Sequence, residues 1–434
     1  MTRTPYTHMV GTMAGKLMTV AIAAGTLAAI LASCSSGGGS AARTVLVDHR
    51  ADEFASSFLH YYPHNVIVHP GDTVNFKVTW SGEPHSVTLG QVVDKVFKYQ
   101  DILQKYSSPD DAIAHGVPQS TVDQVTGTMS RVPGMTGNGQ NIYEPGAKPC
   151  FVPTLSAIPI YSNDGGNTPN YGPAADCPKA DRVQPAFTGT QGLYNSGYIP
   201  FQGDKANSFV VPIANNAVPG TYNYFCNYHW VDMHGTVTIV PKTKKIPSAS
   251  AVNHEAQKEI DKDAKLPLAA VNKANKGNFG GVKAPVAGVA FGDPNSNSGP
   301  GVQVNEFYPK TFHAKVGQPV TWTVQGSDHT VSFNVPTYFP VFTVSPKTGD
   351  VHWDAKSFEG VGWTVPPEPD QNGDGPPPPP RHIDVGSWDG TGGFHSSGTM
   401  SDRETFTVRF TKPGTYQYAC VVHPPMIATL VIDA

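Results

Sequence analysis

The sequence reads Pro-Gly-Thr-Tyr-Asn-Tyr-Phe-Cys over residues 219–226 and Pro-Gly-Thr-Tyr-Gln-Tyr-Ala-Cys over residues 413–420. In each stretch the terminal cysteine is followed three residues later by a histidine and then by a methionine. The residues concerned are Cys226, His229 and Met233 in the first stretch and Cys420, His423 and Met426 in the second. A match of this length predicts two copies of one fold in the chain.

The two copies also match far upstream of these stretches. In both, a Tyr-Pro pair, at residues 62–63 and 308–309, stands eight residues before a glycine and leads into a segment of alternating apolar and polar residues. Alternation with a period of two predicts half-buried strands at 74–78 and 320–324. Each predicted strand leads to a histidine that is followed by similar residues. The segments are His-Ser-Val-Thr from residue 85 and His-Thr-Val-Ser from residue 329.

The composition fits a loop-rich all-β protein. Of the 434 residues, 44 are glycine and 40 are proline, and only 15% are charged. The formal net charge of -4 and the lack of a basic run give no indication of a nucleic-acid partner. The length leaves room for two domains with long insertions.

The repeat sets the expected domain boundaries. We place domain 1 at 44–241 with an insertion at about 91–205, a linker at 242–284, and domain 2 at 285–434 with an insertion at about 337–400. We expect helices near 91–106 and near 251–264. Insertions of this length are usually either functional or disordered.

The donor types repeated in both copies suit copper. One thiolate, two imidazoles and a weakly binding thioether can hold copper in both of its common oxidation states. Little rearrangement between the two states makes one-electron transfer fast. The Cys-x-x-His spacing alone is weak evidence for a copper site, because partial zinc sites share it. Its specificity comes from the distant histidine, the Pro-Gly-Thr-Tyr approach, the methionine and the duplication.

These motifs resemble those of the cupredoxin family, the plastocyanin-like and amicyanin-like blue copper proteins. The Cys-Val-Val-His-Pro-Pro-Met segment at 420–426 is similar to the short amicyanin ligand loop, and the segment 226–235 to a slightly longer plastocyanin loop. The resemblance covers both ends of each copy and implies two tandem Greek-key β-sandwich domains. It also implies two copper ions, one held by His85, Cys226, His229 and Met233 and the other by His329, Cys420, His423 and Met426.

The resemblance leaves details of the two sites to be tested. His234 directly follows Met233, so either residue is a candidate axial ligand in the first site. The backbone N–H groups of Ser86 and Thr330 are expected to point at the thiolates and tune the redox potentials. The prolines at 424–425 have no N–H to offer, so we expect the two sites to differ in potential.

The N-terminus resembles a bacterial lipoprotein signal over residues 1–33. Positive residues precede an apolar stretch at 17–30, which ends in small residues before Cys34. The apolar run is only marginally long enough for a membrane-spanning helix. We therefore predict that Cys34 is lipidated and anchors an exported protein to the outer face of the cell membrane, with 34–43 as a flexible tether.

Two further cysteines, Cys150 and Cys177, lie in a segment rich in Pro, Gly and Asn, with no histidine at ligand spacing. Outside the cytosol, a disulfide between them is the economical interpretation. Such a bond would stabilise a long insertion by on the order of 3 to 4 kcal/mol.

The flanks of the repeated cysteines favour an electron carrier over an enzyme. Copper oxidases and nitrite reductases of this family place a histidine beside the ligand cysteine, whereas Phe225, Asn227, Ala419 and Val421 occupy these positions here. The chain also contains no His-x-His pair with which to build a second kind of copper centre. Copper sequestration, delivery or sensing without electron transfer stays open, and the sequence does not specify a redox partner protein.

Three histidines, His60, His64 and His69, precede the first predicted strand and could form an extra metal patch, although scattered surface histidines are commoner. Tryptophans in the second insertion are expected to pack its loops; they are Trp353, Trp363 and Trp388.

Asp370, Asn372 and Asp374 match the opening of a calcium-binding loop. The match then fails, because prolines follow and the twelfth position is Arg381 instead of Glu.

Overall fold

The computed structural model describes most of the chain after residue 41. The described residues are 42–49, 56–78, 85–106, 108–132, 148–159, 183–199, 207–227, 229–265, 268, 286–289, 302–325, 328–335, 342–344, 351–353, 355–366, 379–423 and 426–434. Several predictions fall outside them: the signal segment with Cys34, the disulfide half at Cys177, the calcium-like residues 370–375 and the prolines 424–425. Within these ranges, no helix is long and apolar enough to cross a membrane.

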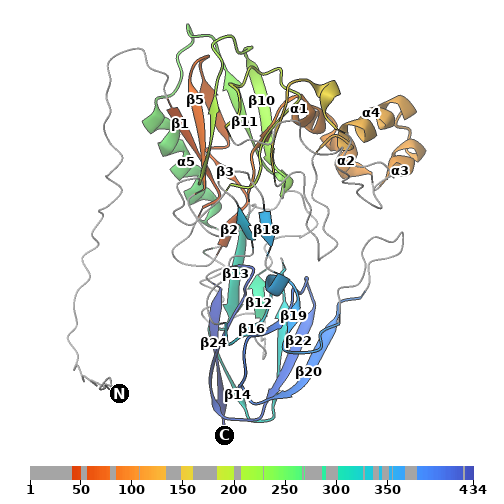
Figure 1. Ribbon diagram of the computed structural model, residues 1–434, viewed down its shortest axis with the longest axis vertical. Coiled ribbons are helices and arrows are strands. Elements are labelled where there is room, and N and C mark those ends of the chain that lie inside the picture. The colour runs from red at the N-terminus through yellow and green to blue at the C-terminus, as the bar shows by residue number, and fades with distance from the viewer. Residues whose placement is uncertain are drawn as a thin grey trace, which may run out of the picture. The chain divides into compact units, whose positions relative to one another are not determined.

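The first β-sandwich consists of two sheets (Figure 1) with strand orders β3-β1-β5-β9 and β4-β11-β10-β6-β8-β7. The strands of the first sheet are β1 Ala42–Val47, β3 Tyr61–Tyr62, β5 Thr73–Val78 and β9 Ser208–Pro212. Those of the second are β4 Asn65–Val68, β6 Thr88–Leu89, β7 Pro149–Val152, β8 Leu193–Ser196, β10 Gly220–Cys226 and β11 Trp230–Ile239. The predicted alternation in β5 is confirmed, because Val74, Phe76 and Val78 are buried and the residues between them are not.

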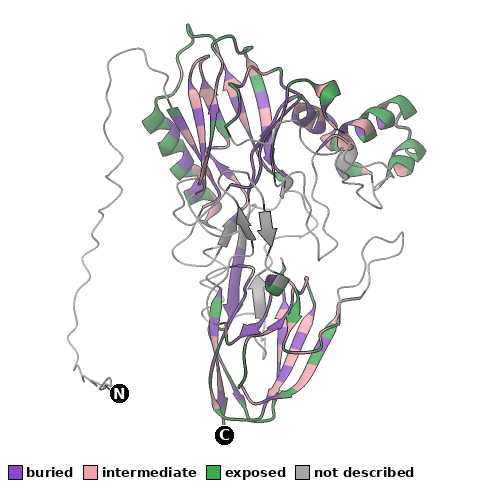
Figure 2. Ribbon diagram, viewed as in Figure 1, coloured by how far each residue is buried: buried purple, intermediate pink, exposed green. Residues whose placement is uncertain are grey.

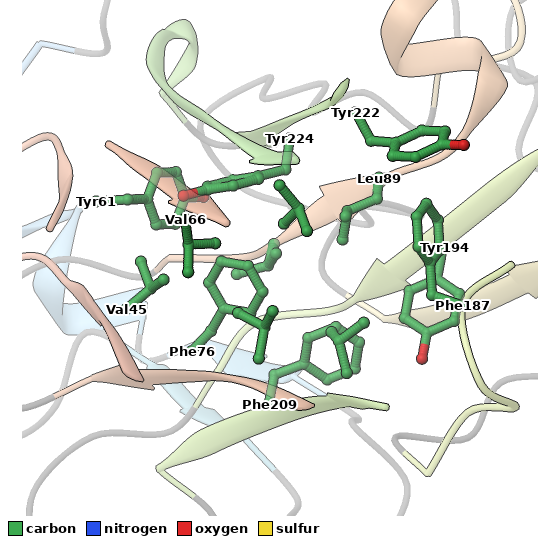
Figure 3. Packing of buried hydrophobic residues seen from close by; sticks show 14 of the residues in the cluster. Val45, Tyr61, Val66, Phe76, Leu89, Phe187, Tyr194, Phe209, Tyr222 and Tyr224 are labelled. Carbon is green, nitrogen blue, oxygen red and sulfur yellow. The ribbon is translucent and has the colours of Figure 1, made fainter. Parts of the chain in front are cut away.

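Aromatic and aliphatic side chains fill the space between the two sheets (Figure 3). Phe76 and Phe209 come from one sheet and Tyr224 from the other, with ring centroids of Phe76 and Tyr224 4.9 Å apart. Cys226 and Met233 belong to the same cluster of buried residues. The core of the sandwich therefore reaches the residues that the sequence predicts as ligands.

The first insertion is partly helical and partly an extension of the second sheet. Its helices are α1 Gln91–Lys98, α2 Gln100–Lys105, α3 Pro109–Ala114 and α4 Gln119–Met129, and a short 3-10 helix spans Leu155–Ala157. The helix predicted near 91–106 is confirmed as the two helices α1 and α2. Helix α1 lies against β10 (Figure 1), where Asp94 accepts hydrogen bonds from the backbone and side chain of Asn223, each at 2.9 Å.

The helix predicted in the linker is also confirmed. Helix α5 spans Ala249–Asp263 and begins at Ser248, whose side chain accepts a hydrogen bond from the Ala251 N–H at 3.2 Å. Val252, Ala256 and Ile260, spaced four apart, form its buried stripe, and the opposite face is exposed (Figure 2). This part of the linker is thus packed against β1 and β3 of the first sandwich.

The second β-sandwich has sheets with strand orders β2-β13-β12-β15-β22-β20 and β14-β24-β23-β16-β21-β19. The strands of the first of these sheets are β2 Ser56–Phe58, β12 Val286–Val289, β13 Val302–Tyr308, β15 Pro319–Val324, β20 His382–Trp388 and β22 Thr405–Phe410. Those of the second are β14 Thr311–Lys315, β16 Ser332–Phe333, β19 Gly360–Val361, β21 His395–Ser397, β23 Gly414–Ala419 and β24 Ile427–Asp433. A separate hairpin joins β17 Phe342–Val344 to β18 Val351–Trp353, and a 3-10 helix spans Ala355–Ser357. The all-β fold class is confirmed.

One strand of the second sandwich comes from an unexpected part of the chain. β2 lies within the sequence assigned to domain 1, yet it pairs antiparallel with β13, with Phe58 opposite Val302. Phe58 is buried in a small cluster with Ile260 of α5 and Tyr308 of β13. A three-residue strand carries too little periodicity for its partner to be predicted from sequence.

The core of the second sandwich is centred on Trp322 of β15, which is fully buried in the alternation predicted for this strand. Trp363 and Trp388 from the second insertion pack on this core, with ring centroids 5.5 Å apart, as expected. The side chain of Trp353 lies outside the described part of the structure. Gly71 and Gly317, which match in the repeat, both have positive φ angles of 90° and 76°, which suit glycine.

Candidate metal centres

The structure brings together two groups of three side chains, one in each sandwich. Cluster 1 is His85, Cys226 and His229, and cluster 2 is His329, Cys420 and His423. In each cluster the three ligating atoms lie within 4.8 Å of one another. Within the described ranges, these are the two groups of three or more His, Cys, Asp or Glu residues whose ligating atoms lie this close together.

Strand ends and one tight loop position the residues of cluster 2. His329 lies beyond β15 and forms an isolated bridge with Met400, while Cys420 directly follows β23. The Cys420 N–H donates to the Met426 carbonyl at 3.0 Å, and the Met426 N–H donates to the His423 carbonyl at 2.9 Å. These two bonds close the loop between β23 and β24 and fix where His423 can lie.

The three ligating atoms of cluster 2 form a compact triangle. His329 Nδ1 and His423 Nδ1 are 3.1 Å apart, and they lie 3.8 and 3.7 Å from Cys420 Sγ. A metal bonded at about 2.0 Å to nitrogen and about 2.3 Å to sulfur separates its ligands by distances of this size. All three residues are at least 97% buried. The donor set therefore fits a single mononuclear metal ion.

The electrostatics of cluster 2 favour a thiolate. Burial by itself raises the pKa of the Cys420 thiol, but His329 and His423 outweigh burial and bring this pKa well below its ordinary value. Burial lowers the pKa of His329, which favours a neutral imidazole. A thiolate and a neutral imidazole are the forms in which these side chains bind metals.

Each sulfur also has a hydrogen-bond donor of the predicted kind. The Thr330 N–H donates to Cys420 Sγ and the Ser86 N–H donates to Cys226 Sγ, both at 3.4 Å. The hydroxyls of the same two residues accept hydrogen bonds from the backbone N–H that follows each cysteine. Val421 N–H donates to Thr330 Oγ1 at 2.9 Å, and Asn227 N–H donates to Ser86 Oγ at 2.8 Å. The expectation that the N–H groups of Ser86 and Thr330 point at the sulfurs is confirmed, and the hydroxyls of the same residues hold the cysteine loops in addition.

Cluster 1 has the same plan. Its histidine rings have centroids 4.9 Å apart, the value also found between His329 and His423. His85 forms an isolated bridge with Ile199, and Cys226 ends β10. Burial raises the pKa of the Cys226 thiol, but His229 and His85 bring it well below its ordinary value.

A buried carboxylate distinguishes cluster 1. Asp48 Oδ2 lies 2.8 Å from His85 Nε2, and both side chains are 1% exposed. Burial lowers the pKa of His85, but Asp48 and Cys226 raise it to about 10, whereas the pKa of His329 is lowered. Asp48 is not among the residues predicted from the sequence, where the only signal for it is its place at the end of the apolar run 45–47.

The two axial candidates of cluster 1 differ in their surroundings. Met233 is fully buried in the core cluster that contains Cys226. His234 lies opposite Phe225 in the β10–β11 pairing, its Nδ1 is 2.6 Å from the Val231 carbonyl, and its ring is 5.3 Å from that of Phe97. Successive strand residues face opposite sides, so these contacts direct His234 away from the face of Met233. Met426 is likewise fully buried with Cys420.

The three histidines considered for an extra metal patch have other contacts. His60 Nδ1 lies 2.7 Å from Asp263 Oδ2, and His64 Nδ1 lies 3.6 Å from Glu259 Oε2, both on α5. His69 Nε2 lies 2.8 Å from the Lys244 carbonyl. The first two therefore help to attach the linker helix to the first sandwich.

Comparisons with known proteins add only a general likeness. No family model and no curated protein matches the chain. Among solved structures, a reduced Cu(I) form of an amicyanin variant is 18% identical over 29% of this chain and 72% of its own, with a TM-score of 0.16. A purple cupredoxin from Nitrosopumilus maritimus is 15% identical over 35% of this chain and 98% of its own, with a TM-score of 0.17.

The sheets and the two clusters themselves define the class of protein. It is an all-β protein with two sandwiches, each holding a group of one cysteine and two histidines that fits a mononuclear metal ion. His229 is partly exposed and the other five residues are buried. Soft sulfur with two imidazoles suits copper better than magnesium or calcium, which prefer oxygen ligands.

Proposed function

We propose that the protein binds two type 1 copper ions, one at each cluster, and carries single electrons at the outer face of a bacterial cell membrane. The observation that supports this most strongly is the triangle of Cys420 Sγ, His329 Nδ1 and His423 Nδ1, with sides of 3.1 to 3.8 Å in a buried setting. Attachment to the membrane would use a lipid on Cys34.

Each copper would have four protein ligands in this proposal. His329, Cys420 and His423 with Met426 would hold one ion, and His85, Cys226 and His229 with Met233 would hold the other. The burial of Met233 in the core cluster that contains Cys226 supports the choice of this residue over His234 as the axial ligand. Bound copper supplies a couple that accepts and returns one electron.

The chain's own residues would keep the geometry constant between the two oxidation states. The backbone donors at Ser86 and Thr330 hold the sulfurs, and the loop bonds of Met426 hold the histidine side of cluster 2. Burial excludes water, which would otherwise reorganise when the charge changes. The sequence around both cysteines lacks the neighbouring histidines of the oxidases, which supports a carrier without catalytic activity.

Repeated reduction and reoxidation of the copper-loaded protein distinguishes electron transfer from copper storage or delivery. We expect residues 43–434 with bound copper to be reduced and reoxidised repeatedly by small redox reagents in the presence of a Cu(I) chelator. A carrier should show reversible one-electron waves and keep its copper throughout. Transfer of copper to the chelator at the first reduction would instead indicate storage or delivery.

A further inference from the structure

Asp48 is an acidic side chain within hydrogen-bond distance of the cluster histidine His85. Its backbone has a positive φ of 62°, a conformation that aspartate adopts more readily than most residues. The Asp48 N–H donates to the His60 carbonyl at 3.1 Å, which fixes the backbone at this point. The carboxylate therefore has little freedom to turn away from His85.

Both oxygens of this carboxylate accept hydrogen bonds. Oδ1 accepts from the N–H of Phe58 at 2.7 Å and from the N–H of His49, while Oδ2 lies 2.8 Å from His85 Nε2. A carboxylate that accepts only from N–H groups is suited to keep its negative charge in a buried place. The same contact makes Nε2 the protonated nitrogen of His85 and leaves Nδ1 for the cluster.

The second sandwich has no carboxylate at the matching position. Leu46 of β1 pairs with Tyr62 and Lys77, and Val286 of β12 pairs in the same way with Tyr308 and Thr323. Two residues further on, Asp48 therefore corresponds to Gly288, which has no side chain. Asp328, the acidic residue next to His329 in the chain, also acts on His329 and His423 through its charge, but its carboxylate accepts a hydrogen bond from Ser401.

We propose that Asp48 is a positioning residue that orients His85 and makes cluster 1 the copper site of lower redox potential. The inference rests on the proposed function. The carboxylate lies on the far edge of a ligand ring, close enough for its charge to favour the more positive oxidation state of the metal. Its hydrogen bond also makes the imidazole a stronger donor, which favours the same state. A chain that holds one electron therefore holds it at cluster 2.

The test uses the full chain loaded with copper. Cys420→Ser isolates cluster 1 and Cys226→Ser isolates cluster 2, so each midpoint potential is measured alone. We expect the midpoint of cluster 1 to be the lower of the two. Asp48→Asn keeps a hydrogen-bonding side chain but removes the charge. It should raise the midpoint potential of cluster 1 by at least about 59 mV, which is a tenfold increase in the equilibrium constant for reduction by one electron. In the Cys226→Ser background, the same substitution should leave the midpoint of cluster 2 unchanged.

Nuclear magnetic resonance of the Cu(I) form provides a second readout. The Nε2–H of His85 should give a slowly exchanging signal in the wild type and in Asp48→Asn, and Asp48→Ala should lose it. The proposal is overturned if both clusters bind copper but cluster 1 has the equal or higher midpoint. An unshifted midpoint in a folded Asp48→Asn protein also overturns it. If no copper binds at all, the proposed function itself fails. The midpoint potentials of the two clusters are compared in proteins that keep Asp48. This comparison can therefore overturn the proposal even if the Asp48 variants do not fold.

Discussion

At the scale of single residues, the two clusters use the same donors in different surroundings. Both sulfurs receive a backbone N–H at 3.4 Å, and both histidine pairs have ring centroids 4.9 Å apart. Asp48 Oδ2 lies 2.8 Å from the ring of His85, so a buried carboxylate adjoins the first cluster. Similar geometry with unequal charge is how one fold could hold two sites of different potential.

The identity of the axial residue in cluster 1 gives a prediction at this scale. Met233→Gln should lower the midpoint potential of cluster 1 and alter its thiolate-to-copper absorption, because a hard oxygen donor favours the oxidised ion. His234→Ala is the matched control and should change neither property, since its ring contacts Phe97 and its Nδ1 lies by the Val231 carbonyl. Spectra and voltammograms are recorded in the Cys420→Ser background. The reverse pattern would identify His234 as the ligand.

The cluster residues could be predicted from sequence because the Cys-x-x-His spacing is local and the distant histidine recurs in both copies, whereas Asp48 could not. Cys226 and His229 are three residues apart on one loop, so their proximity follows from the chain itself. Asp48 lies 37 residues before His85 and reaches it only after β1 has paired with β5. The pairing that creates the contact is a property of the folded sheets.

At the scale of secondary structure elements, long strands were predictable and short ones were not. The period of two in β5 and β15 predicted their buried faces, and α5 forms where the sequence predicted a short helix. The three-residue strand β2 has no such period, and its pairing with β13 depends on tertiary contacts of Phe58. Within the insertions, the sequence predicted one helix but not the strands that extend the sheets.

A buried ion pair between two elements of the second sandwich gives a pH-dependent prediction. Arg381, just before β20, donates to both oxygens of Glu404, just before β22, from Nε at 2.7 Å and from Nη2 at 2.6 Å. Burial raises the pKa of Glu404, but Arg381 outweighs it and lowers the pKa below the ordinary value. A lowered folded-state pKa stabilises the fold at pH above the ordinary glutamate pKa, and this stabilisation is lost as the pH falls through the folded pKa.

Glu404→Gln should therefore reduce the free energy of unfolding at pH 7 by about 1.5 to 3 kcal/mol, and the difference from wild type should shrink as the pH falls below about 4. Urea unfolding of the copper-free protein at several pH values measures both effects. Asp384→Asn, which breaks the more exposed pair with Arg409, is the control and should cost clearly less than Glu404→Gln. A penalty that does not depend on pH would show that the pair acts only through packing.

At the scale of the whole molecule, the proposed function requires two metal sites in one chain. Each sandwich has its own core, and each core includes the cysteine and the methionine of its cluster. Deletion of one cluster should therefore leave the other core intact. The two sites can then be counted and compared independently within one protein.

The most direct test is the amount and colour of bound copper in residues 43–434. The wild type should bind two copper ions per chain and show the intense blue absorption of a copper thiolate. Cys226→Ser and Cys420→Ser should each bind one ion and keep about half of that absorption, because the thiolate is the ligand that produces it. The double variant should be colourless. Unchanged colour in either single variant, or a colourless wild type loaded with copper, would contradict the account.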